Sequence, residues 1–247
     1  MTDWYDIDEF WDVMSHKLFA EKNPAETKKE IEQMISLTGI SPNSKILDLC
    51  CGQGRHSLEL AKRSFKVTGV DRTEKYLEKA KSKASEKNLS IEFIKDDMRN
   101  FKRANYFNAI IIMYTSFGYF EDHNENTKVL RNSFSSLRKK GLLLIDVVGK
   151  EILQRKFTES ESFELDGITY IEERNVIDNW SRIENRWIML KDNLQKEFKL
   201  SHWVYSENEL KKMLSNAGFS SVKIFGDLAG GQYDENAERL IAIALKL

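Results

Sequence analysis

The sequence predicts an α/β fold, with a doubly wound and mostly parallel sheet that helices cover on both faces. Two observations lead to this prediction. Between Lys45 and Lys150, short apolar runs alternate with segments of helical periodicity, which is the pattern of parallel strands buried on both sides. One of these runs leads through a Gly-x-Gly turn, from Gly52 to Gly54, directly into a helical segment. Such a junction is typical of sheets that bind a ligand at the carboxyl ends of their strands.

Two helices are expected ahead of the sheet. Apolar residues at positions 7, 10, 11, 14 and 18 recur with the period of a helix and form one stripe. Further along, Asn23, Pro24 and Glu26 supply an N-cap, a proline at the first helical position and an acid at the third. Gly39 suits the position just after the end of this second helix. We therefore expect the chain up to residue 40 to be helical.

The core of the sheet is expected to contain five short apolar runs, at 46–50, 66–70, 91–94, 109–113 and 142–145. The helices between them are marked by apolar residues on one face: Leu58 and Ala61, then Leu77, Ala80 and Ala84, then Leu130, Phe134 and Leu137. Thr73 is placed to cap the second of these helices. Because a helix lies between most pairs of successive strands, those strands are expected to run parallel.

The pattern changes after residue 150. Three segments, 168–178, 182–190 and 196–205, tend to alternate apolar and polar residues and are separated by turn-forming residues. They predict an antiparallel meander inserted into the core. Ser206 and Glu209 then form a capping box at the start of a helix. The apolar runs 222–225 and 240–245 supply two more strands and bring the sheet to seven.

Composition excludes several classes of protein. The 247 residues carry 38 Lys and Arg against 39 Asp and Glu, a formal net charge of −1, which argues against binding nucleic acid by bulk electrostatics. Cys50 and Cys51 are the only cysteines, so neither a disulfide framework nor a four-ligand zinc site is expected, and no metal is predicted. No apolar run approaches 18 residues and the acidic start lacks a secretory signal, which predicts a cytoplasmic protein.

An acidic residue follows the Gly-x-Gly turn at a distance that indicates a cofactor site. Gly52 and Gly54 allow the backbone to approach a ligand closely, and the helix behind them offers unpaired N–H groups. Asp71 ends the second strand, 17 residues after Gly54. That is the distance expected of an acid that binds ribose hydroxyls at the neighbouring strand end. The pair of features predicts an adenosine-containing cofactor.

Two details indicate which cofactor. Position 57 is serine, so the third glycine of the dinucleotide fingerprint is absent. Asp48 precedes the turn, where a carboxylate would repel a pyrophosphate and favour a cationic ligand. A ligand that has ribose and adenine at one end and a positive charge at the other is S-adenosylmethionine.

With these residues in place, the chain resembles the class I S-adenosylmethionine-dependent methyltransferases of the bacterial small-molecule type. The resemblance covers residues 40–150 and 206–245, and its signature runs from Asp48 to Gly54, with Cys50 in place of the first glycine of the family motif. The resemblance implies a Rossmann-like methyltransferase fold with S-adenosylmethionine as cofactor. It also implies these cofactor-binding residues: Asp48, Cys50, Gly52, Gly54, Asp71, Arg72, Asp97, Met98 and Met113.

The resemblance also implies a division of the chain. Residues 1–40 correspond to an N-terminal helical lid, and 41–150 together with 206–247 correspond to the cofactor-binding core. Residues 151–205 correspond to an antiparallel β insert that caps the substrate or mediates dimerisation. Either a monomer or a homodimer fits this arrangement.

The acceptor side is expected after the fourth strand. The segment 113–120 is rich in aromatic residues at a sheet edge where ligands bind, and Tyr114, Phe117 and Tyr119 are its candidate substrate-facing residues. His123 follows as a candidate general base. The segment lacks the Asn/Asp-Pro-Pro-Tyr/Phe motif of enzymes that methylate amino groups of nucleobases and glutamine, which disfavours a DNA-directed enzyme.

These features predict methyl transfer to nitrogen or oxygen of a small molecule by in-line displacement. An RNA- or protein-directed methyltransferase is the alternative among enzymes of this kind. A non-catalytic cofactor-binding partner subunit is a second alternative, and it would gain weight if segment 114–120 packed inward without a cavity. A nicotinamide-dependent reductase is a third, disfavoured by Ser57 and Asp48.

Overall fold

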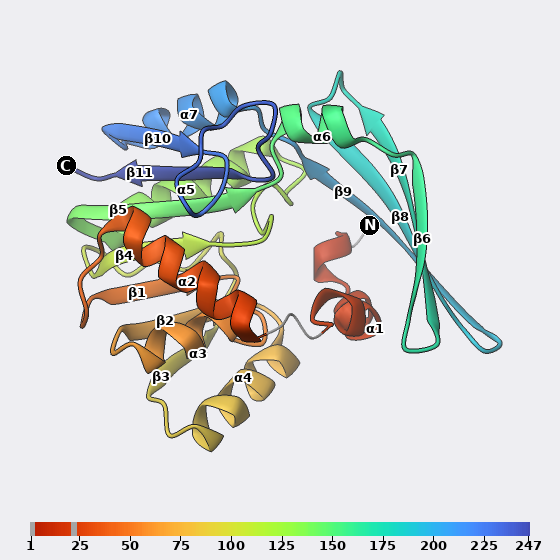
Figure 1. The fold of residues 1–247 in the computed structure, drawn as a ribbon, viewed down its shortest axis with the longest axis horizontal. Coiled ribbons are helices and arrows are strands. Elements are labelled where there is room, and N and C mark those ends of the chain that lie inside the picture. The colour runs from red at the N-terminus through yellow and green to blue at the C-terminus, as the bar shows by residue number, and fades with distance from the viewer. Residues whose placement is uncertain (1–2, 21–23) are drawn as a thin grey trace.

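A seven-stranded sheet forms the centre of the computed structural model, which describes residues 3–20 and 24–247 (Figure 1). Its strand order is β10-β11-β5-β4-β1-β2-β3, with β11 antiparallel to both of its neighbours and β1 to β5 mutually parallel. The strands are β1 (Lys45–Leu49), β2 (Lys66–Asp71), β3 (Ile91–Lys95), β4 (Phe107–Ile112), β5 (Leu137–Val147), β10 (Ser221–Phe225) and β11 (Leu240–Leu245). The predicted mostly parallel α/β sheet is confirmed.

Helices cover both faces of the sheet, as the buried residues of β4 show. Ile111 packs in one apolar cluster with Ile31 and Leu60, whereas the adjacent Ile110 packs in another with Leu130. Successive strand residues point to opposite faces, so each cluster marks one face. The helices are α2 (Pro24–Thr38), α3 (Arg55–Lys62), α4 (Glu74–Glu86), α5 (His123–Ser136) and α7 (Glu207–Asn216). Helices α2 and α3 thus lie opposite α5 and α7.

The expected helix boundaries hold in part. The capping box at Ser206 and the positive φ of Gly39 are both present. Leu137, expected in a helix, is instead the first residue of β5, because α5 ends at Ser136 and the backbone of Leu137 is extended. Thr73 takes the N-cap position of α4, but its side chain makes no capping hydrogen bond. The predicted cap at Asn23 lies outside the described residues.

The insert forms a separate antiparallel sheet of four strands, β6 (Ser160–Leu165), β7 (Ile168–Ile177), β8 (Arg182–Lys191) and β9 (Leu194–Trp203). The three strands β7 to β9 are the predicted meander. Strand β6 and the preceding helix α6 (Lys150–Lys156) were not predicted. Strand β6 lies at the sheet edge and most of its side chains are exposed, so it has no buried face to produce an apolar pattern.

The N-terminal segment lies between the two sheets (Figure 1). It consists of the 3-10 helix η1 (Trp4–Asp6) and helix α1 (Asp8–Leu18). Phe10 and Met14 of α1 are fully buried in one cluster with Tyr170 and Phe198 of the insert sheet. Helix α1 therefore fills the apolar face of the insert and is held against the edge of the main sheet. Within the described ranges, no helix has the length and apolar character needed to cross a membrane.

Candidate functional site

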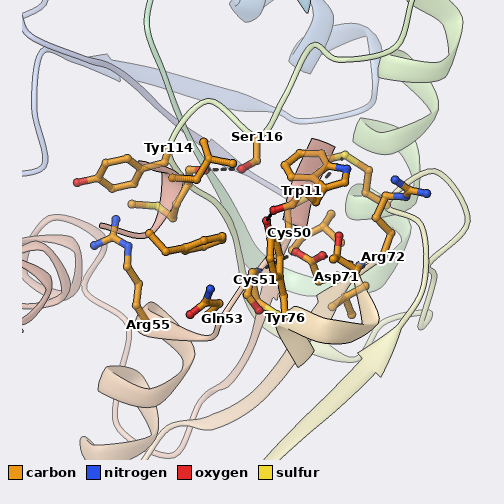
Figure 2. A pocket seen from close by; sticks show the side chains of 18 of the residues that line it. Trp11, Cys50, Cys51, Gln53, Arg55, Asp71, Arg72, Tyr76, Tyr114 and Ser116 are labelled. Carbon is orange, nitrogen blue, oxygen red and sulfur yellow. Dashed lines mark hydrogen bonds between the residues drawn. The ribbon is translucent and has the colours of Figure 1, made fainter. Parts of the chain in front are cut away.

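A cavity of about 340 Å³ lies at the carboxyl ends of β4, β1, β2 and β3. The chain reverses its order in the sheet between β1 and β4, and such a switch point leaves a crevice beyond the strand ends. The N-terminal segment closes the cavity from the other side with Tyr5, Trp11 and Phe19. Figure 2 shows Trp11 lying over the cavity, with Arg55 and Tyr114 at one end and Arg72 at the other.

The loop after β1 has an unusual backbone. Cys50, Gly52 and Gly54 all have positive φ, at 65°, 54° and 77°. A Cβ atom at Gly52 would lie 2.9 Å from the ring of Phe19, and one at Gly54 would lie 3.0 Å from the Cβ atom of Ala80. Both positions therefore require glycine. Cys50 keeps its side chain in this conformation.

Asp71 ties the end of β2 to this loop. Its Oδ2 accepts a hydrogen bond of 2.8 Å from the N–H of Gly52, and its Oδ1 accepts one of 2.9 Å from the N–H of Thr73. Burial raises the pKa of Asp71 above its usual value. Each carboxylate oxygen accepts only one of these bonds, so each keeps a lone pair for a ligand hydroxyl.

Asp48 has a different position from the one expected. Its side chain is 1% exposed, and its Oδ2 accepts a 2.6 Å hydrogen bond from the hydroxyl of Ser57. Asp48 is not among the described residues that line the cavity. Asp48 therefore lies behind the loop that lines the cavity, and its role in binding the cofactor stays a prediction. Ser57, which replaces the third glycine of the dinucleotide motif, is its partner.

The end of β3 brings a second carboxylate to the cavity. Asp97 accepts hydrogen bonds from Nε and Nη2 of Arg99 at 2.9 and 2.6 Å. Burial acts to raise the pKa of Asp97, but the Arg99 interactions outweigh burial and hold it below its usual value. Met98 lines the cavity beside it, and its sulfur lies 3.5 Å from Sγ of Cys50.

Arg72 lies at the same end of the cavity. Its Nη2 is 3.0 Å from a carboxylate oxygen of Asp6 in η1. Its other terminal nitrogen, Nη1, is buried and has no hydrogen-bond partner among the described residues. A buried N–H group without a partner is rare in folded proteins, and Arg72 lines the cavity at the end where the sequence predicts the adenosine part of a cofactor.

The opposite end of the cavity contains Arg55 and Tyr114. The guanidinium of Arg55 lies 4.1 Å from the centre of the Tyr114 ring, and its Nη1 donates a 2.6 Å hydrogen bond to Glu30 of α2. Glu30 also contacts His56 at 3.2 Å and accepts a hydrogen bond from the Tyr114 hydroxyl. Glu30 was not predicted from the sequence, because an acid on a charged helix carries no signal of its own.

The loop after β4 places most of its aromatic residues in the cavity wall. Met113, Tyr114 and Tyr119 line the cavity, whereas Phe117 is 1% exposed and packs in the core. The backbone of Tyr114 has a φ of 55°, a strained conformation for a residue other than glycine. Because these side chains surround a cavity, the segment does not pack inward as the partner-subunit alternative requires.

Two further residues hold this loop in place, and neither was predicted from the sequence. Asp146 of β5 accepts a 3.2 Å hydrogen bond from the N–H of Tyr114, and its main-chain carbonyl accepts a 2.8 Å bond from the N–H of Thr115. Arg239 donates a 2.6 Å hydrogen bond from Nε to the Asp146 carboxylate. Asp146 lies within an apolar strand, a position that could have drawn attention to it.

His123 is placed elsewhere. It is the first residue of α5, and its ring lies edge-on to those of Trp203 and Tyr205, at 5.1 and 6.0 Å. These three side chains line a second cavity of about 260 Å³. His123 is not among the described residues of the first cavity, so the structure does not bring it to the other predicted site residues.

Comparisons of sequence agree with this geometry. Residues 46–141 match a family model described as a methyltransferase domain. The putative methyltransferase YqeM of Bacillus subtilis is 29% identical over 82% of this chain and 84% of its own length. A glycine/sarcosine N-methyltransferase of Aphanothece halophytica is 24% identical over 82% and 76%. The 23S rRNA (uracil(1939)-C(5))-methyltransferase RlmD of Photobacterium angustum is 36% identical over only 35% of this chain and 39% of its own.

Solved structures share the fold over nearly the whole chain. The CcbJ methyltransferase of Streptomyces caelestis superposes with a TM-score of 0.77 and 18% identity, covering 92% of this chain and 98% of the other. CalS10, an amino pentose methyltransferase of Micromonospora echinaspora, superposes with a TM-score of 0.68 and 17% identity, covering 96% and 97%.

Proposed function

Since this chain is a class I S-adenosylmethionine-dependent methyltransferase, we propose that it transfers the methyl group to a nitrogen atom of a small molecule. The observation that carries the proposal is the covered cavity. The N-terminal segment covers it, and the insert sheet packs against that segment in turn. A small acceptor can be enclosed in such a space, whereas a polynucleotide needs an open groove.

The side chains around the cavity fit the two ends of the cofactor. Asp71 is proposed to accept hydrogen bonds from the ribose hydroxyls, and Asp97 to accept one from the adenine amino group. Arg72, which has one buried nitrogen without a partner among the described residues, is proposed to lie against the adenine. Two glycines form a cradle in the loop after β1: Gly52 lines the cavity, where the backbone can approach the methionine part, and Gly54, which is not among the described lining residues, lets the loop pack closely against Ala80.

The bound cofactor supplies an activated methyl group on a sulfonium, which a nucleophile can displace in line. The chain's own contribution is to orient the acceptor and to exclude water. Tyr119 is suited to orienting the acceptor, because it lines the cavity. Burial raises the pKa of its hydroxyl, so the hydroxyl stays protonated and can donate a hydrogen bond. Ser116 lines the cavity beside it and adds a second hydroxyl. Trp11 above the cavity excludes solvent.

Nitrogen is favoured over oxygen as the accepting atom. A hydroxyl acceptor usually needs a general base within hydrogen-bond reach, whereas an amine needs only to be neutral and correctly oriented. Among the described residues that line the cavity, His56 is the one histidine, and its Nε2 is engaged by Glu30. The relatives named for glycine and sarcosine, and the structure named for an amino pentose, support an amine.

An RNA acceptor is the second candidate, and the comparison with RlmD is the observation in its favour. That match covers 35% of this chain, which is no more than the part expected to bind the cofactor. It supports a shared cofactor and not a shared acceptor. The net charge of −1 supplies no broad attraction for a polyanion.

The proposal is tested by incubating the purified protein with methyl-labelled S-adenosylmethionine and cell fractions. The fractions are small metabolites, RNA and protein. We expect label in the small-metabolite fraction, in a product whose new methyl group is bonded to nitrogen. The Asp71→Asn variant is the control for background transfer. Label confined to RNA or protein, or a product methylated at oxygen, would overturn the proposal.

A further inference from the structure

The carboxylate of Glu30 forms hydrogen bonds with residues from two separate parts of the site. Arg55 and His56 come from the start of α3, and the hydroxyl of Tyr114 comes from the loop after β4. Burial acts to raise the pKa of Glu30, but the hydrogen bonds from His56 and Tyr114 and the charge of Arg55 lower it to about 2. The carboxylate is therefore ionised at neutral pH and holds all three groups at once. Its side chain is 16% exposed, so solvent competes little for these contacts.

Arg55 is held firmly by residues of α2 and also lines the cavity. Nη1 donates to Glu30 at 2.6 Å and to the hydroxyl of Thr27 at 3.1 Å, and the guanidinium lies against the Tyr114 ring. Nη2 is buried and has no hydrogen-bond partner among the described residues. A buried guanidinium N–H without an acceptor is costly. Both Arg55 and Thr27 line the cavity, and the Arg55 side chain is 25% exposed, so a ligand there can contact this side chain.

The two ends of the cavity differ in charge. Asp71, Asp96 and Asp97 line the end nearest Arg72, and they disfavour an anionic group there. The described lining residues include no acid at the other end, where Arg55 pairs with Glu30 of α2. S-adenosylmethionine has one carboxylate, at the end opposite its adenosine. The cavity therefore favours the orientation in which this carboxylate lies toward Arg55 (Figure 2).

We propose that Glu30 is a positioning residue that fixes Arg55 at the cavity wall so that its guanidinium meets the cofactor carboxylate, and that links this contact to Tyr114 on the acceptor side. The inference rests on the cofactor and not on the identity of the acceptor. The link is physical, because Glu30 and Arg55 contact the hydroxyl and the ring of the same tyrosine. Binding of the carboxylate immobilises Arg55, and an immobile Arg55 stabilises the strained backbone of Tyr114.

The test compares two ligands that share the adenosine. S-adenosylhomocysteine carries the amino-acid carboxylate, and 5′-methylthioadenosine lacks it. We expect Arg55→Met to weaken the first ligand by roughly 5- to 150-fold, as when a charged hydrogen bond is lost, and to change the second by less than about twofold. Glu30→Gln should show the same selectivity with a smaller loss, roughly 5- to 20-fold. Calorimetry measures both affinities.

Glu32→Gln is the matched control, since Glu32 lies on the same helix and its half-exposed carboxylate pairs with Arg63 away from the cavity. It should leave both affinities unchanged. If Glu30→Gln weakens both ligands equally, or weakens neither, the proposal is wrong. It is also wrong if the wild-type protein binds both ligands equally well, because the carboxylate then contributes nothing.

A second measurement tests the link to Tyr114 and does not depend on the Glu30 variant. Hydrogen exchange of the backbone amides at 113–117 should slow when S-adenosylhomocysteine binds and should slow less with 5′-methylthioadenosine. Tyr114→Phe removes only the hydroxyl that reaches Glu30. It should keep the affinity for S-adenosylhomocysteine within about threefold while losing most of the ligand-dependent protection. Equal protection by the two ligands in the wild-type protein would overturn the link.

Discussion

Arg72 and Asp6 form an ion pair, with Nη2 and Oδ1 3.0 Å apart, that joins the turn after β2 to the 3-10 helix η1. A second contact reinforces it, because the hydroxyl of Tyr76 in α4 donates a hydrogen bond to the main-chain carbonyl of Trp11. Both contacts join the core to the N-terminal segment beside the cavity. We expect a cofactor bound beneath this segment to leave faster when these contacts are broken.

We predict that Asp6→Asn speeds the release of S-adenosylhomocysteine by roughly three- to tenfold, because the ion pair beside the cavity is lost. The pair is about one-third exposed, so its removal should lower the free energy of unfolding by no more than about 1 kcal/mol. Stopped-flow displacement of the ligand measures the rate. Glu197→Gln, which breaks an ion pair with Arg186 on the insert sheet, should leave the rate unchanged. A release rate that is the same in both variants would show that η1 does not retain the ligand.

Asp71→Asn should weaken binding of S-adenosylhomocysteine by about 1–3 kcal/mol, the cost of a lost polar partner. Asp71 is buried and already accepts one hydrogen bond on each oxygen, so the amide can replace it in shape but has only one accepting oxygen. Calorimetry gives the affinity. Glu92→Gln on the next strand, whose carboxylate pairs with Arg103 at the surface, is the control. Unchanged affinity in Asp71→Asn would remove the ribose assignment.

Cys50→Gly and Gly52→Ala should differ in the size of their effects. Cys50→Gly relieves a positive φ and adds freedom to the unfolded chain, so the two effects nearly cancel and stability should change by less than about 1 kcal/mol. Gly52→Ala places a Cβ atom 2.9 Å from Phe19 in the N-terminal segment. It should weaken cofactor binding and increase cleavage of that segment by a protease. If both variants bind normally, the glycine cradle is not required.

The fold was predictable because its signals are local. Each strand of the main sheet is a short apolar run, and each helix between them has a buried stripe, so residues such as Leu77 and Ala80 marked their faces correctly. Strand β6 gave no such signal, since its side chains are exposed at a sheet edge. Leu137 was assigned to the wrong element because an apolar residue at the end of a helical stripe fits equally well at the start of a strand.

The site was predictable only where the chain carries a motif. Gly52, Asp71 and Met98 follow strand ends in sequence, and the structure places all three around one cavity. Glu30 and Arg239 reach the site through tertiary packing, and nothing in their local sequence distinguishes them from surface charges. His123 lies close in sequence to the aromatic segment 113–120, but it begins helix α5 and lines another cavity. A residue that follows a strand end in sequence therefore need not belong to the site when it already lies in the next helix.

His202 is predicted to make stability depend on pH. It lies on β9 opposite Ile183, on the strand face that it shares with Leu200, and burial lowers its pKa from 6.5 to about 4. The unfolded chain therefore binds a proton below pH 6.5 that the folded protein does not. The contribution of His202 to stability is fully present above pH 6.5, and the free energy of unfolding falls by about 1–3 kcal/mol in all as the pH drops toward 4.

The His202→Gln variant should lose less of its free energy of unfolding over the same pH interval. Urea unfolding at pH 7, 6 and 5 measures the difference, and these values stay above the range in which Glu30, with a pKa of about 2, titrates. Parallel curves for the wild type and the variant would mean that His202 is protonated in the folded protein.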